Sequence, residues 1–91
     1  MMIARRFIVK GDVQGVGFRW FTIRAARRLG VVGTVRNLPD GTVEAIAEGP
    51  PDSIDGLRTE LERGPSHARV GSVSVTEIPA TGAYTGFDVS Y

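Results

Sequence analysis

The stretch Gly11-Asp12-Val13-Gln14-Gly15-Val16-Gly17-Phe18-Arg19 decides how the chain is interpreted, because it joins a strand pattern to a helix pattern. Ile3 to Val13 is rich in β-branched and aromatic residues, which predicts a strand. Trp20 to Leu29 carries apolar residues at helical spacing and is followed by a glycine, which predicts a helix. Gln14 to Arg19 lies between them and contains two glycines, so it is predicted to be a loop.

The rest of the chain continues this alternation of strands and helices. The turn Pro39-Asp40-Gly41 indicates a hairpin between two strands. The final segment alternates apolar and polar residues, so it either closes the sheet at an edge or continues the strand before it. The predicted elements are strands at Val31 to Leu38 and Thr42 to Glu48, a helix from Pro50 to a stop at Gly64-Pro65, a strand at Ala68 to Ile78, and a short strand from Phe87 to Tyr91.

The order strand, helix, strand, strand, helix, strand is the split βαβ pattern. It predicts an α+β, ferredoxin-like sandwich in which two helices cover one face of a mainly antiparallel sheet. With 91 residues and no linker, repeat or low-complexity segment, residues 1–91 are predicted to form a single domain.

The composition excludes several chemistries. There is no cysteine, so disulfides and thiolate nucleophiles are excluded, and the single histidine, His67, cannot build a multi-histidine zinc site. Composition alone leaves a carboxylate-bound magnesium open. The formal net charge of +1 gives no nucleic-acid signal. No apolar run approaches the roughly 20 residues of a membrane span, and no signal peptide is evident. We expect a cytoplasmic monomer that acts without nucleic acid or membrane.

The loop from Gln14 to Arg19 is a candidate anion site. Backbone N–H groups in such a turn can converge on one point, and the helix that follows adds its own free N–H groups. Arg19 can make a forked contact with phosphate, and a cation at a helix N-terminus otherwise lies at the unfavourable end. The alternative is a tight turn with Arg19 in solvent. The candidate phosphate-binding residues are Gln14, Gly15, Val16, Gly17, Phe18 and Arg19.

Asn37 is the second candidate. It lies near the end of a predicted strand, where asparagine often caps a turn through its own backbone. In a split βαβ sheet, however, this strand and the first strand can lie near each other. Asn37 could then face the anion.

Both segments resemble the signatures of the acylphosphatase family. The matching residues are Gly11-x-Val13-Gln14-Gly15-Val16-Gly17-Phe18-Arg19 and Gly33-x-Val35-Arg36-Asn37-x-x-x-Gly41-x-Val43, with further similarity at Gly64-Pro65-x-x-Ala68-x-Val70. The resemblance implies hydrolysis of the carboxyl–phosphate bond of small acyl phosphates, without metal or cofactor. It implies that Arg19 binds the phosphate and that Asn37 positions water. Thr34 stands where the family usually has an aromatic residue, which leaves the local packing in question.

Other residues receive plainer interpretations. We expect Trp20 and Phe21 to support the core or the loop, His67 to be a surface or capping residue, and Asp40 and Glu44 to serve a turn and an exposed strand. Arg24, Arg27 and Arg28 are expected to form a solvated helix face near the negative end of the helix dipole.

Two other functions remain possible. The same cradle could bind phosphate or carbamoyl phosphate without turnover. An RNA-binding sheet is disfavoured, because such sheets stack bases on central-strand aromatics and Thr42 to Glu48 contains none.

Overall fold

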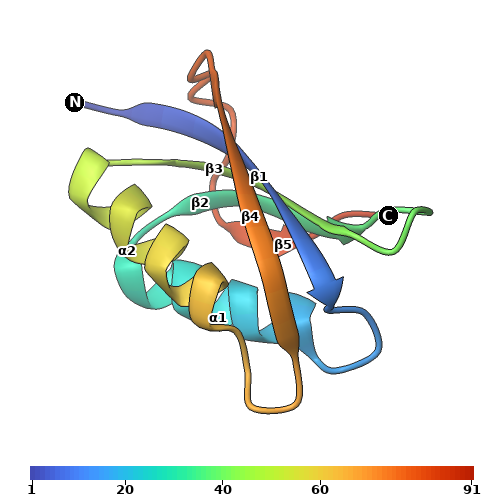
Figure 1. The fold of residues 1–91 in the computed structure, drawn as a ribbon. Helices are drawn as coiled ribbons and strands as arrows, with labels where there is room; N and C mark the ends of the chain where they lie inside the picture. The colour runs from blue at the N-terminus through green and yellow to red at the C-terminus, as the bar shows by residue number, and fades with distance from the viewer.

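Five strands form one sheet, and two helices lie against one of its faces (Figure 1). The computed structural model describes residues 1–91. The elements are β1 at Ile3–Asp12, α1 at Phe18–Leu29, β2 at Val32–Asn37, β3 at Val43–Gly49, α2 at Pro51–Arg63, β4 at Arg69–Ile78 and β5 at Phe87–Val89. The predicted ferredoxin-like class and the order of the elements are confirmed. Neither helix is long and apolar enough to cross a membrane.

The strands are arranged in the order β4-β1-β3-β2-β5. All neighbouring pairs are antiparallel except β2 and β5, which are parallel. The possibility that the last strand continues β4 is therefore wrong. Residues 79–86 carry the chain from the β4 edge to the opposite edge, where Val35 pairs with Val89 (Figure 1). The predicted closing edge strand is correct.

Helix α1 begins two residues earlier than the sequence predicts. Its N-cap is Gly17, in the left-handed conformation with φ 76° and ψ 19°. No side chain caps this end, and the first turn contains no acidic residue. Phe18 and Arg19 therefore belong to the first helical turn, where N–H groups have no partner inside the helix.

The core lies between the sheet and the helices. Alternation along β1 sends Phe7 and Val9 to this face, where both are fully buried. Helix α2 contributes Leu57 and Leu61, which are also fully buried. Burying each such side chain stabilises the fold by about 1.5–3 kcal/mol. Trp20 does not join them, because it falls on the opposite side of α1 from Phe18, and 56% of its surface is exposed.

The other sheet face carries two buried carboxylates. Glu44 accepts hydrogen bonds from Arg6 Nε at 2.7 Å and from Arg36 Nε at 2.8 Å. The expected exposed-strand role for Glu44 is therefore wrong, because two cross-strand arginines enclose it. Burial raises the pKa of Glu44, but the hydrogen bonds from Arg36 and Arg6 outweigh this and lower it. Thr34 lies on this same face, opposite Ile46 and half-buried.

Glu48, the second carboxylate, holds the connection between β4 and β5. It accepts hydrogen bonds from the Thr81 N–H at 3.0 Å, the Thr81 hydroxyl at 2.8 Å and the Gly82 N–H at 3.0 Å. Its side chain is 1% exposed. This clamp fixes the segment that delivers β5 to the edge of β2.

Candidate active site

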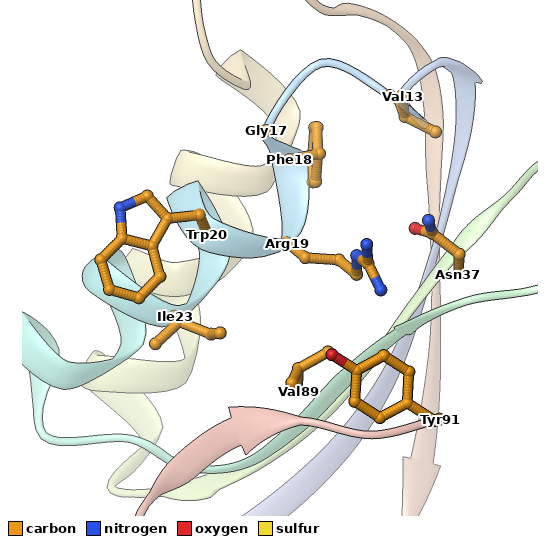
Figure 2. Close-up of a pocket in the computed structure, with 10 residues that line it drawn as sticks. Val13, Gly17, Phe18, Arg19, Trp20, Ile23, Asn37, Val89 and Tyr91 are labelled. Atoms are coloured by element: carbon orange, nitrogen blue, oxygen red, sulfur yellow. The ribbon is translucent and has the colours of Figure 1, made fainter.

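A cavity of about 280 Å³ lies where the loop after β1, the start of α1 and the end of β2 meet (Figure 2). Its lining side chains include no carboxylate and no imidazole, the groups that usually hold a divalent metal. Arg19 is its one charged side chain. The lining residues are Val13, Gly15, Gly17, Phe18, Arg19, Trp20, Ile23, Asn37, Val89 and Tyr91.

The loop supplies backbone donors to this cavity. Gly15 and Gly17 both have φ 76°, a conformation that costs a residue with a side chain about 1–2 kcal/mol. The backbone N–H groups from Gln14 to Gly17 donate to no acceptor in the chain. Together with the uncapped start of α1, they provide a set of free donors suited to an anion.

Arg19 projects from the first turn of α1 toward Asn37 (Figure 2). Its guanidinium forms none of the molecule's seven salt bridges and donates no side-chain hydrogen bond within the chain. Its one charge-related contact is with the Tyr91 ring, whose centroid lies 6.0 Å from Cζ. The forked donor group is thus free to bind a ligand, and the interpretation of Arg19 as a solvent-directed residue does not fit this placement.

Asn37 reaches the same cavity because of the register of β2. Val35 faces the helices, so Asn37 two residues later faces them as well. The turn that follows is held by Asp40, which accepts hydrogen bonds from the Thr42 N–H at 3.0 Å and the Thr42 hydroxyl at 2.6 Å. The turn role expected for Asp40 is confirmed. The carboxamide of Asn37 has no hydrogen bond within the chain and remains available to a ligand or water.

Gln14 connects the two halves of the site. Its Nε2 donates to the carbonyl oxygens of Leu38 at 2.8 Å and Thr42 at 2.9 Å. The side chain is therefore committed to the β2–β3 hairpin, which leaves the backbone N–H of Gln14 for an anion. The link holds the loop at a fixed position relative to the hairpin that carries Asn37.

The six residues of the predicted phosphate-binding loop differ in how they contribute to the cavity. Gly15, Gly17 and Arg19 line the cavity directly, and Phe18 also contributes to the lining while its ring is buried in the core. Val16 is half-buried against the core and does not line the cavity. We therefore expect Val16 to act through its backbone alone.

Sequence reasoning missed five lining residues. Trp20 is exposed at the cavity, so the expectation that it could join the core is wrong. The alternation of Phe87, Val89 and Tyr91 with polar residues places all three on one face, a signal that could have identified Val89 and Tyr91. Nothing local marks the others. The missed residues are Val13, Trp20, Ile23, Val89 and Tyr91.

The fold and the cavity define a small α+β protein with a turn of free backbone donors at a helix N-terminus. The family model described as Acylphosphatase matches residues 5–89. An acylphosphatase of Synechococcus sp. is 55% identical over 78 residues, 86% of this chain and 78% of that one. An acylphosphatase of Rubrobacter xylanophilus is 54% identical over 84 residues, 92% and 76% of the two chains. The chain therefore belongs to the acylphosphatase family, whose members are enzymes that hydrolyse acyl phosphates.

Solved structures agree with this assignment. The crystal structure of acylphosphatase from Bacillus subtilis superimposes with a TM-score of 0.94 at 36% identity, and the match covers 100% of both chains. Full-length HypF, in a phosphate- and nucleotide-bound form, matches 100% of this chain with a TM-score of 0.91 and 28% identity. The match covers only 12% of HypF.

Proposed function

We propose that this acylphosphatase uses Arg19 and the loop N–H groups to hold the phosphoryl group, and Asn37 to orient the attacking water. One observation carries the proposal. Gly15 and Gly17, whose backbone N–H groups are free, border one cavity together with the unpaired guanidinium of Arg19 and the unpaired carboxamide of Asn37. A tetrahedral, doubly charged phosphoryl group offers acceptors to all of these donors.

The reaction requires one bond to form and one to break. The water oxygen attacks phosphorus while the bond between phosphorus and the acyl oxygen breaks, and the electron pair of that bond leaves with the carboxylate. The dianionic acyl phosphate and water thus yield one carboxylate and dihydrogen phosphate, each with one negative charge. Because carboxylic acids have pKa values of roughly 4, the leaving group departs without a general acid.

Asn37 positions the water without taking its proton. Its carbonyl can accept a hydrogen bond from water and its amide can donate one, but a carboxamide is not a base at neutral pH. The proton passes to the phosphoryl oxygens or to solvent. Positioning and electrostatic stabilisation supply most of the catalysis in phosphoryl transfer, so no metal or cofactor is included in the proposal.

The binding-module alternative uses the same cradle without turnover. Its support is the match to HypF, in which the corresponding region is a small part of a much longer chain. It predicts phosphate binding without release of phosphate from an acyl phosphate. A single assay of phosphate release therefore distinguishes hydrolysis from binding without turnover.

The test is phosphate release from acetyl phosphate by the purified protein. We expect the wild type to release phosphate. In Arg19→Ala, kcat should fall roughly 10²- to 10³-fold, as is typical when one preorganised donor is lost. In Asn37→Ala, kcat should also fall strongly. Arg58→Ala is the matched control, because Arg58 is exposed on α2 and pairs only with Glu62. Tight phosphate binding without any phosphate release would favour the binding module.

We further propose that residues 1–91 act as one domain, since both helices and the β4–β5 connection pack on a single sheet, and that this domain is a monomer. Light scattering should give a mass near 9.8 kDa. The proposal retains the cytoplasmic location, which cell fractionation would test.

A further inference from the structure

The cavity has a polar half and an apolar half, separated by Arg19. Figure 2 shows Asn37 on one side of Arg19 and Trp20 with Ile23 on the other, with Val89 and Tyr91 along the adjoining edge. We call Trp20, Ile23, Val89 and Tyr91 the apolar wall. The proposed chemistry uses none of these four side chains.

Two members of the apolar wall are unusually exposed. Trp20 is 56% exposed and Tyr91 is 96% exposed, and the other exposed large apolar side chains are Met1 and Met2 at the start of the chain. Each aromatic ring has an arginine over it, because Arg24 Cζ lies 6.0 Å from the Trp20 centroid and Arg19 Cζ lies 6.0 Å from the Tyr91 centroid. Such contacts favour one ring position. The rings are thus held in place without being covered.

The wall has the chemistry of an apolar subsite next to an anion site. Arg19 is the only charged side chain that lines the cavity, and the four side chains of the apolar wall are uncharged. Ile23 is nearly buried and Val89 is half-buried, which gives the wall a packed base. A volume of about 280 Å³ lies close to the lower limit, roughly 300 Å³, of cavities that hold small organic ligands.

We propose that the apolar wall binds the acyl group of the substrate and that Trp20 makes the enzyme prefer acyl phosphates with an aromatic acyl group over small ones. The inference rests on the proposed function, because Arg19 must hold the phosphate for the acyl group to reach the wall. An aromatic acyl group can stack on or meet the edge of the Trp20 ring, whereas an acetyl group is too small to do so.

The test compares kcat/KM for benzoyl phosphate with kcat/KM for acetyl phosphate in each variant. The ratio of the two values cancels differences in intrinsic reactivity when variants are compared. We expect Trp20→Ala to lower the ratio by about 2- to 12-fold, the range of aromatic pair contacts. Trp20→Phe should retain most of it. Met2→Ala is the matched control, because Met2 is 52% exposed and does not line the cavity.

Trp20 is the only tryptophan, so its fluorescence reports binding without turnover. Phenylphosphonate should change the emission saturably, and inorganic phosphate should not. An active enzyme whose substrate ratio is the same in Trp20→Ala as in the wild type would overturn this inference alone. A protein that hydrolyses neither substrate but shows the emission change would instead overturn the proposed hydrolysis, with aromatic binding retained.

Discussion

Two loops of this molecule present neighbouring backbone N–H groups, and they differ in what those groups meet. At the β4–β5 connection, Thr81 and Gly82 donate to the buried carboxylate of Glu48. At the loop before α1, Gln14 to Gly17 donate to no acceptor in the chain. The first loop is satisfied by the protein's own anion and therefore serves stability. The second retains unpaired donors beside Arg19, and that difference separates the structural clamp from the proposed binding site.

The largest expected effect comes from changing the guanidinium of Arg19, which lies beside the unpaired N–H groups of Gln14 to Gly17. Arg19→Lys keeps the charge but removes the planar pair of donors. We expect kcat to fall roughly 10²-fold, as for loss of one preorganised donor, with the thermal midpoint little changed. Steady-state hydrolysis of acetyl phosphate and a melting curve measure both. A near-normal rate would show that Arg19 acts only as a point charge.

Changes at the β4–β5 connection, whose N–H groups are paired with Glu48, should alter the stability of the protein and not its rate of hydrolysis. Glu48→Gln replaces a charged acceptor by an amide that also turns a donor toward Thr81 and Gly82. We expect a loss of about 2 kcal/mol in the free energy of unfolding, in the range of hydrogen bonds to buried charged groups. Urea denaturation measures it, and Glu77→Gln is the control because the Glu77 side chain is 83% exposed. Equal stability in the two variants would contradict the clamp.

Low pH should selectively weaken the interaction of Glu48 with the β4–β5 connection. The Thr81 N–H holds the pKa of Glu48 below its ordinary value of 4.5, aided by the Gly82 N–H and the Thr81 hydroxyl and opposed by burial. A lowered folded-state pKa stabilises the protein fully above about pH 4.5, and this contribution is lost as the pH falls through the folded value. We expect the stability gap between wild type and Glu48→Gln to narrow below pH 4.5. A constant gap from pH 6 to pH 3 would contradict this linkage.

The smallest expected effect is at His67. The pairing of Asp12 with Arg69 brings the loop that carries His67 beside the end of β1. His67 is nevertheless exposed and does not line the cavity. A general base would contribute roughly 10²- to 10⁴-fold, whereas we expect His67→Ala to leave kcat/KM and its pH profile unchanged. A large loss of kcat/KM, or an inflection that the wild type shows and His67→Ala lacks, would require a base in the mechanism.

The sequence predicts the elements and their class well, because each element carries its own period and stop signals. The sequence predicts the start of α1 two residues too late, because Gly17 caps the helix without a side-chain signal. The sequence does not specify the position of β5, because a three-residue alternation cannot specify its partner strand. Its place beside β2 depends on a connection that Glu48 anchors from another strand.

The candidate site also contains residues that could be predicted from the sequence and contacts that could not. The loop and Arg19 could be predicted because their chemistry lies within nine consecutive residues. Asn37 could be linked to them only through the topology. The bonds of the Gln14 side chain, the burial of Glu44 between two arginines and the exposure of Trp20 depend on segments distant in sequence. No local pattern specifies such contacts.

The strand order also bears on how the chain reaches its native state. Only β2 and β3 pair with a close neighbour in sequence, while β1 must find β3 and β4, and β5 must find β2. A sheet built from such distant partners has a high contact order, and loop-closure entropy opposes each pairing before its contacts form. Despite its short length, the chain is therefore expected to fold on a timescale of about milliseconds to seconds, slower than a helical bundle of similar length.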